Sequence, residues 1–280
     1  MAGEYVEKFE TEFVTSGASK IIVEGGISCK FVEDKPVSMR CIFRDITHRK
    51  EIERMKNEFI ATVSHELRTP LTAIHGSLGA IAGGIGGEVP PRVKTLTELA
   101  RKNSARLIRM INDFLDVEKM ESGRMEFHIK PVEFMSLIEN AIDTTRSFGD
   151  KFGVKYVLKE KIPGAMVNSD GDRIVQVVTN LLSNAAKFSR PDTDVNISVT
   201  RNDAYLKVEV ADRGSGIPEE FRPRIFQKFA QASKGDRAGT GLGLSISKAI
   251  IERLGGSIGF ESQINKGSTF YFELPELKPV

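Results

Sequence analysis

The stretch that decides the fold is VQVVTNLLSNAAK, residues 175–187. It contains no Gly or Pro, and its apolar residues recur at helical spacing, so it predicts a helix over about residues 171–188. Asn180, Asn184 and Lys187 are spaced by four and three, which places two amides and an ammonium group on one helix face. Amide oxygens can ligate a hard cation such as Mg2+, and the ammonium group can hold phosphate charge. Taken alone, the three residues fit a partly solvated helix face equally well.

Two Gly-rich segments follow this helix along the chain. Residues 212–218 read DRGSGIP after a predicted strand; the glycines would let the backbone approach a flat ligand, and the carboxylate of Asp212 would accept from an exocyclic amino group. Residues 239–244 read GTGLGL and open a predicted helix over residues 242–254, whose free N–H groups attract phosphate. Each segment alone could also be an ordinary turn or helix start.

A histidine segment, SHELRTPL, occupies residues 64–71. Glu66 adjoins His65, and Thr69 lies four residues after it, on the same face of a helix. Pro70 cannot donate to the helical ladder, so we expect the helix to bend or loosen just after the histidine and to expose the imidazole. On its own, a helical histidine is more often a surface or packing residue.

The histidine segment belongs to a long amphipathic helix that begins near residue 47. Its apolar stripe is followed by a Gly- and Pro-rich break at residues 83–91 and by a second helical pattern over residues 92–120. These two helices form a helical hairpin, and a second copy would cover their exposed stripes. We therefore expect a homodimer held by a four-helix bundle.

Strand patterns flank the helical region. Residues 9–46 predict about three antiparallel strands. After residue 123 we expect strands near residues 125–130, 154–159, 195–201, 205–212, 257–262 and 268–274, with helices near residues 133–148, 171–188 and 242–254. This order is typical of one layer of helices on one sheet. The weak pattern between Asp212 and Gly239 is typical of a mobile loop or lid.

Composition excludes several classes. In 280 residues, 40 Lys and Arg stand against 38 Asp and Glu, which is too balanced for a dedicated nucleic-acid binder. Two cysteines cannot build a disulfide framework or a zinc cluster within one chain. We find no run of about 18 apolar residues and no signal pattern, so we expect a cytoplasmic chain without membrane contact.

The order of the motifs resembles the sensor histidine kinases of two-component signalling, over about residues 48–275. In the vocabulary of that family, residues 64–71 match the H box, 180–187 the N box, 212–216 the G1 box, 226–229 the F box, 239–244 the G2 box and 267–270 a closing GSTF element. The resemblance implies an α+β multidomain chain: the C-terminal strands of a PAS domain (residues 1–46), a dimeric phosphotransfer helical hairpin (47–122) and a Bergerat (GHKL) α/β sandwich that binds ATP (123–280).

The resemblance also implies an activity. The chain would be an ATP-dependent autokinase that phosphorylates His65 and passes the phosphoryl group to a response-regulator receiver domain. Glu66 would orient His65 or take its proton, and with Thr69 it matches the family's pattern for a phosphatase of that regulator. Asn184 would bind Mg2+, Asp212 the adenine amino group, and Thr269 would support Asp212. The implied ATP-binding residues are Asn180, Asn184, Lys187, Asp212, Gly214, Gly216, Ile217, Phe229, Gly239, Thr240, Gly241, Leu242, Gly243, Leu244 and Thr269.

Two rival functions remain. ATPases that share this nucleotide fold place a carboxylate one turn before the metal-binding Asn, to activate water; here that position is Asn180, an amide that cannot act as a general base. The second rival is a catalytically silent dimeric scaffold that binds nucleotide. Acid-labile, base-stable phosphate on His65 would distinguish the kinase from both.

Overall fold

The computed structural model describes residues 5–32, 35–85, 87–231 and 239–277. Part of the predicted lid before Gly239 therefore lies outside the described residues. The chain divides into two units, residues 1–73 and 74–280. The elements in order are β1 (Tyr5–Val14), β2 (Lys20–Val32), β3 (Lys35–Asp45), α1 (Thr47–Ala82), α2 (Pro91–Glu121), β4 (Lys130–Glu133), α3 (Phe134–Lys151), β5 (Val154–Glu160), β6 (Met166–Ser169), α4 (Gly171–Phe188), β7 (Thr193–Asn202), β8 (Tyr205–Ala211), a 3-10 helix (Glu219–Arg224), α5 (Gly243–Arg253), β9 (Ser257–Gln263) and β10 (Gly267–Pro275).

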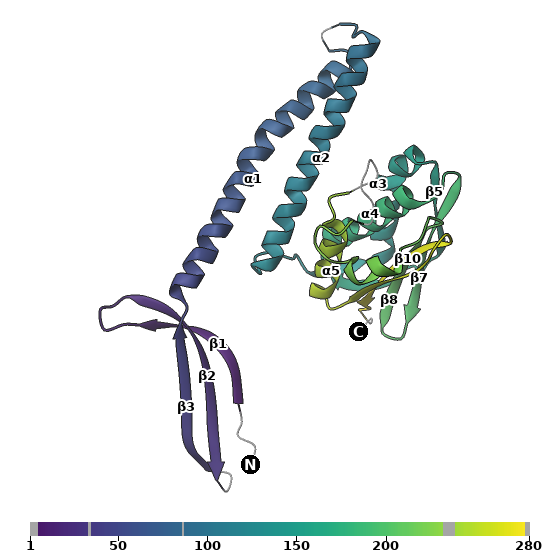
Figure 1. Ribbon diagram of the computed structural model, residues 1–280. Helices are drawn as coiled ribbons and strands as arrows, with labels where there is room; N and C mark the ends of the chain where they lie inside the picture. Colours follow the sequence, from purple (N-terminus) through teal and green to yellow (C-terminus); the bar gives the residue numbers. More distant parts are fainter. Residues whose placement is uncertain (1–4, 33–34, 86, 232–238, 278–280) are drawn as a thin grey trace. The chain divides into compact units, whose positions relative to one another are not determined.

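The first unit opens with a three-stranded antiparallel sheet in the order β1-β2-β3, which confirms the predicted strands (Figure 1). The sheet is joined to α1 by hydrogen bonds at the junction. The hydroxyl of Thr47 accepts from the backbone N–H of Ile22 at 2.9 Å, and Oδ1 of Asp45 accepts from the N–H of Thr47 at 2.9 Å. The start of α1 is thereby fixed to the middle strand of the sheet.

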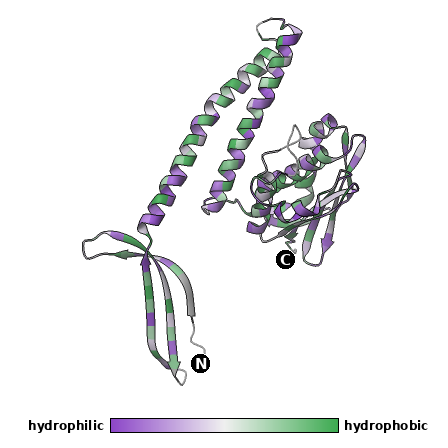
Figure 2. Ribbon diagram, in the orientation of Figure 1, coloured by the Kyte–Doolittle hydropathy of each residue, from purple (hydrophilic) through white to green (hydrophobic). Residues whose placement is uncertain are grey.

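Helix α1 continues through Pro70 without interruption. The proline removes one backbone donor, but the turns on both sides keep their own hydrogen bonds, so the predicted loosening does not divide the helix. Hydrophobic residues recur along α1 and α2 among hydrophilic ones (Figure 2). Many of those on α1 are well exposed in the single chain: Ile52, Met55, Phe59, Val63 and Leu67.

The second unit begins with the end of α1 and the whole of α2. Pro91 occupies the first turn of α2, where a missing N–H costs nothing. Nδ1 of His75, near the end of α1, lies 3.0 Å from Oγ of Ser104 on α2. The predicted helical hairpin is confirmed at this closed end.

The rest of this unit is a layer of three helices, α3, α4 and α5, on a mixed sheet (Figure 1). The strand order is β5-β7-β8-β10-β9, with β5 parallel to β7 and the other pairs antiparallel. The core between the layers is apolar, and the rings of Phe134 on α3 and Phe272 on β10 meet edge to face at 6.4 Å. The predicted single layer of helices on one sheet is confirmed.

One predicted strand is wrong. Residues 124–129 carry no strand, and β4 begins at Lys130, where it pairs with β6, a strand that the sequence did not predict. The backbone groups of the intervening segment bond elsewhere, since the N–H of Met125 donates to the carbonyl of Lys119 and that of His128 to Oδ2 of Asp170 at 2.9 Å. These bonds hold the segment against α2 and the start of α4 instead of a sheet.

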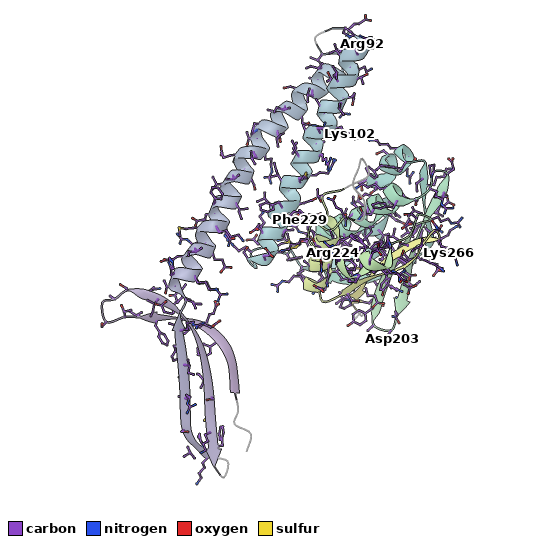
Figure 3. All side chains as sticks on the ribbon, viewed as in Figure 1. Arg92, Lys102, Asp203, Arg224, Phe229 and Lys266 are labelled. Carbon is purple, nitrogen blue, oxygen red and sulfur yellow. The ribbon has the colours of Figure 1, made fainter. Side chains whose placement is uncertain are left out.

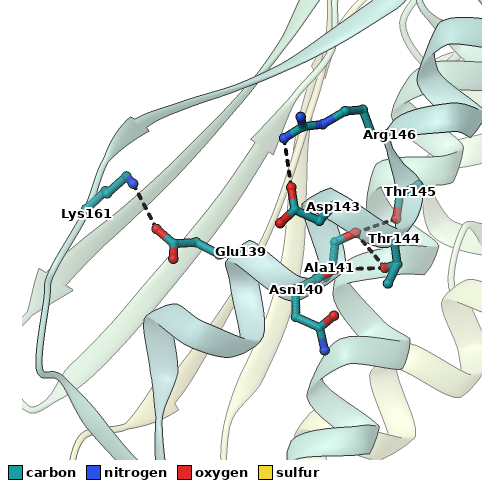
Figure 4. A network of polar contacts seen from close by, with 8 residues as sticks. All are labelled: Glu139, Asn140, Ala141, Asp143, Thr144, Thr145, Arg146 and Lys161. Carbon is teal, nitrogen blue, oxygen red and sulfur yellow. Dashed lines mark hydrogen bonds and ion pairs between the residues drawn. The ribbon is translucent and has the colours of Figure 1, made fainter.

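Helix α3 is amphipathic, and its outer face carries exposed ion pairs. Glu139 pairs with Lys161 at 2.8 Å and Asp143 pairs with Arg146 at 2.7 Å (Figure 4). On the buried face, the hydroxyl of Thr145 donates to the carbonyl of Ala141, one turn earlier, at 2.6 Å. Exposed ion pairs of this kind contribute little stability, so burial of the opposite face holds α3 in place.

Among the helices of the described residues, none has the length and apolar character that crossing a membrane requires.

Candidate functional site

The polar face of α4 lies where the sequence predicted it. Asp170 caps the helix by accepting from the N–H of Arg173 at 3.2 Å, and the buried apolar face fixes its rotation against the sheet. Nδ2 of Asn180 donates to Oγ of Ser247 on α5 at 2.9 Å, and Nδ2 of Asn184 approaches Oδ1 of Asn180 at 3.5 Å. The first amide therefore joins two helices, and the second presents its oxygen as a hard acceptor.

The beginning of α5 packs against this amide. A Cβ added at Gly243 would lie 2.3 Å from Oδ1 of Asn180, so a larger residue here would displace that amide. Leu242 is buried in the core and Leu244 packs against it, so the side chains of both residues belong to the core. Among the described residues, no side chain caps the first turn of α5, so its N–H groups and the positive end of its dipole remain for an anionic ligand.

Lys187 lies beside the glycine-rich turn that precedes α5. A Cβ at Gly239 would lie 3.8 Å from its Nζ, which places the ammonium group beside the glycine-rich turn. Burial is the main cause that lowers the pKa of Lys187, and the charge of Arg109 adds to it, while Asp113 acts in the opposite direction. A phosphate group at this turn would meet a partly desolvated cation, where electrostatic attraction is stronger than in water.

Asp212 follows β8 on the inner face of the sheet. Its Oδ1 accepts from the N–H of Gly214 at 2.8 Å and from the N–H of Ser268 at 3.2 Å. Burial raises the pKa of this carboxyl, although both hydrogen bonds lower it. A desolvated carboxylate held by two backbone donors is a fixed acceptor for a ligand's N–H group.

Ser268, and not Thr269, supports Asp212, which differs from the prediction. Thr269 pairs with Ala211 on β8, and side chains alternate along a strand, so Thr269 lies on the opposite face from Asp212. Ser268 is buried and its hydroxyl lies 2.9 Å from that of Ser262. Local sequence preferences do not distinguish Ser268 from Thr269 as the residue that supports Asp212.

The glycines of the Asp212 turn serve the fold of the turn itself. A Cβ at Gly214 would lie 2.3 Å from the carbonyl oxygen of Phe188, and one at Gly216, whose φ is +72°, would lie 2.3 Å from that of Gln263. Close contact with protein backbone, not approach to a flat ligand, accounts for both. Ile217 is nearly buried beyond the turn, and its N–H donates to Oγ of Ser262 at 2.8 Å.

A second tight contact joins residues 226–229 to the glycine-rich turn. A Cβ at Gly241, whose φ is +75°, would lie 2.8 Å from the backbone carbon of Phe229. Phe229, labelled in Figure 3, also has a positive φ of 60°, and 64% of its surface is exposed. The backbones of the two segments therefore touch, and the ring of Phe229 points away from the core.

Helix α2 also contacts this site, which the sequence did not predict. Oγ1 of Thr240 donates to Oδ2 of Asp113 at 2.7 Å and accepts from the N–H of Leu242 at 3.2 Å. Three residues later, Oδ2 of Asp116 accepts from Nε2 of Gln176 on α4 at 2.9 Å, and Val117 is buried in the core. Asp113, Asp116 and Val117 share one face of α2, a pattern that predicts packing but not its partner.

His65, the predicted phospho-acceptor, lies in the first unit. The side chain of His65 is 73% exposed, and its Nδ1 lies 3.5 Å from Oε1 of Glu66. Oγ1 of Thr69 donates to the carbonyl of His65 at 3.3 Å, which confirms that the two residues share one helix face. The imidazole is open to another molecule or domain.

Two family models match this chain. Residues 55–123 match the His Kinase A (phospho-acceptor) domain, and residues 169–278 match the histidine kinase-, DNA gyrase B- and HSP90-like ATPase. The first match contains His65, and the second contains the amides of α4, Asp212 and the glycine-rich turn.

Relatives and solved structures agree with these matches. The chain is 33% identical over 240 residues to the sensor protein SrrB of Staphylococcus aureus, a match that covers 83% of this chain and 40% of SrrB. The chain thus spans well under half of the length of these curated relatives. It is similar in structure to full-length ShkA in complex with AMPPNP, with a TM-score of 0.65, 26% identity and coverage of 80% of this chain and 46% of ShkA. The histidine kinase AdeS of Acinetobacter baumannii matches with a TM-score of 0.55, 25% identity and coverage of 75% and 97%.

Proposed function

Because this chain belongs to the sensor histidine kinases, we propose that it is an ATP-dependent autokinase that phosphorylates its own His65. The observation that carries the proposal is the exposed imidazole of His65, inside the phospho-acceptor match, with a carboxylate 3.5 Å from its Nδ1. The alternatives, an ATPase or a silent scaffold, do not require such a pair.

The chemistry needs a nucleophile and a proton acceptor. Because Glu66 lies by Nδ1 of His65, we assign Nε2 as the atom that attacks the terminal phosphorus of ATP. The bond from Nε2 to phosphorus forms, the bond from phosphorus to the leaving oxygen of ADP breaks, and Glu66 takes the proton from Nδ1. Phosphoryl transfer depends mainly on positioning and charge neutralisation, so few other groups are required.

The nucleotide would be held by groups from three elements. Asp212 accepts from the adenine amino group, supported by the N–H of Ser268. Lys187 and the N–H groups at the start of α5 take the phosphates. The amide oxygen of Asn184 suits Mg2+, since its nitrogen is already directed at Asn180, and the ion would neutralise phosphate charge.

Asn180 argues against water as the phosphate acceptor. Its Nδ2 donates to Ser247, and an amide has no protonation state that could remove a proton from water. With no base at the position that such an ATPase would use, the phosphoryl group is left for His65.

The remaining assignments complete the proposal. The chain has three domains. Residues 1–46 form a PAS-like sheet, residues 47–122 form the dimerisation and phosphotransfer region, and residues 123–280 form the ATP-binding domain. The exposed apolar side chains of α1 support a homodimer through a four-helix bundle. The partner is a receiver domain whose aspartate takes the phosphoryl group in the cytoplasm.

The test that separates kinase from ATPase measures both products in one reaction. Parent protein with Mg2+ and γ-labelled ATP should yield acid-labile, base-stable protein label, and Asn180→Asp should increase free phosphate relative to protein label. Free phosphate without protein label in the parent would support the ATPase, and bound nucleotide without either product would support the scaffold.

The phosphatase assignment has its own test. Thr69→Ala should spare autophosphorylation and impair dephosphorylation of the receiver, because the hydroxyl one turn after His65 would position the attacking water. Equal loss of both activities would show that Thr69 only supports the helix.

A further inference from the structure

A carboxylate from α2 occupies the part of the site that we assign to phosphate. Asp113 accepts from the hydroxyl of Thr240 at 2.7 Å, although the two residues are 127 positions apart. Thr240 in turn accepts from the N–H of Leu242, next to the start of α5. Two successive hydrogen bonds therefore connect Leu242, the residue just before α5, to the carboxylate of Asp113.

The surrounding charges are those that a phosphate group would use. Lys187 and Arg109 both act on Asp113 by attraction, and Asp116 by repulsion. Burial, the largest cause, raises the pKa of Asp113. The carboxylate is thus a half-buried anion beside the cation and the helix start that the proposed function gives to the nucleotide.

A carboxylate and a phosphate group bind the same kinds of partner. Both are anionic acceptors that bind ammonium groups, hydroxyls and N–H groups through charge-assisted hydrogen bonds. We propose that Asp113 is an internal competitor of the nucleotide phosphates, which occupies their subsite when α2 is docked on the ATP-binding domain. This inference rests on the proposed function, because it takes Thr240, Lys187 and the start of α5 as the phosphate subsite.

The docking of α2 holds the carboxylate of Asp113 at a high effective concentration beside the phosphate subsite. Val117 is buried in the core, and Asp116 binds Gln176 and lies 3.8 Å from Arg173. These contacts lie one turn from Asp113 on the same helix face, so they return its carboxylate to the subsite whenever the face is docked. Nucleotide must displace Asp113, and the apparent affinity falls by the fraction of molecules in which the subsite is open.

The test compares ATP with adenosine, which lacks phosphates. Binding of each to the full chain is measured by calorimetry for the parent, Asp113→Asn and Asp113→Ala, with Asp143→Asn as a control that removes an exposed carboxylate from α3. The alanine variant removes the hydrogen bond as well as the charge and keeps a good helix former. Thermal unfolding checks that each variant folds.

We expect both Asp113 variants to bind ATP about three- to tenfold more tightly, with adenosine and the control unchanged. Unchanged or weaker ATP binding would overturn the inference. Equal tightening of ATP and adenosine would also overturn it, because α2 would then cover the whole site and not the phosphate subsite. Failure of the parent and all variants to bind either ligand would instead contradict the proposed function.

Linkage supplies a second measurement. If Asp113 and phosphate compete, saturating ATP must weaken the docking of α2 by the same factor. Amide hydrogen exchange over residues 110–118 should therefore rise on addition of ATP in the parent, and it should rise less in Asp113→Ala. Exchange that falls or stays constant in the parent would contradict competition.

Discussion

Replacement of Asp212 by Asn should separate nucleotide binding from stability. The asparagine Oδ1 can still accept from the N–H groups of Gly214 and Ser268, which now lie 2.8 and 3.2 Å from the carboxylate oxygen. Its Nδ2, however, takes the place of Oδ2 and directs a donor at the adenine amino group. A hydrogen bond to a charged acceptor contributes about 1.5–3 kcal/mol, so ATP should bind about 10- to 150-fold more weakly.

Although Asp212→Asn should weaken ATP binding, it should not lower the thermal stability of the chain. Burial raises the pKa of Asp212, so between its ordinary value and the raised value the folded chain keeps a proton that the unfolded chain has lost. Stability therefore falls as pH rises through this window, and above it the buried charge opposes folding. Asp212→Asn removes that charge, so at pH 7 its unfolding temperature should equal or exceed that of the parent, by a margin that shrinks on acidification.

Calorimetric titration with ATP and thermal unfolding at pH 7 and at acidic pH measure both effects, with Asp143→Asn as the control for loss of an exposed carboxylate. ATP affinity equal to that of the parent would refute the role of Asp212 in adenine binding. A clearly lower unfolding temperature at pH 7 would refute the reasoning on its buried charge.

Three further predictions concern packing and burial. Gly214→Ala places a Cβ 2.3 Å from the backbone oxygen of Phe188, so it should reduce the free energy of unfolding by about 1–3 kcal/mol and the unfolding temperature by roughly 2–12 °C. The control is Gly17→Ala, where the nearest atom to the added Cβ is 3.9 Å away, and it should leave the unfolding temperature unchanged. Phe134→Ala should cost about 3–5 kcal/mol in denaturant unfolding because the ring is fully buried against Phe272, and a loss under 1 kcal/mol would contradict that packing. Burial raises the pKa of Tyr156 to about 12, so the free energy of unfolding should fall as pH rises from 10 to 12. In an absorbance titration, Tyr156→Phe should lose this late phenol ionisation, and a late phase that persists would belong to another tyrosine.

Elements with strong local signals could be predicted from the sequence. Helix α4 begins at Gly171 and ends at Phe188, as predicted, because its cap, its apolar period and the following Ser189-Arg190-Pro191 turn all act within the segment. The strand expected at residues 125–130 failed because the backbone of that segment bonds to Lys119 and Asp170, partners that no local pattern reveals. Strand β6 has only four residues, too few to establish an alternation.

The same division holds in the site. The spacing of Asn180, Asn184 and Lys187 follows from one helix, so the sequence alone places them together. The contact of Asp113 with Thr240 joins two distant elements, and the choice of Ser268 over Thr269 depends on a strand register. Only tertiary structure fixes relations of these two kinds.

The most direct test of the central claim is phosphate on His65. Parent protein, His65→Gln and Asn184→Ala are incubated with Mg2+ and γ-labelled ATP, and the protein label is tested for lability in acid and stability in base. The account predicts an acid-labile label in the parent that is lost in both variants. A label that persists in His65→Gln, or that resists acid, would contradict it.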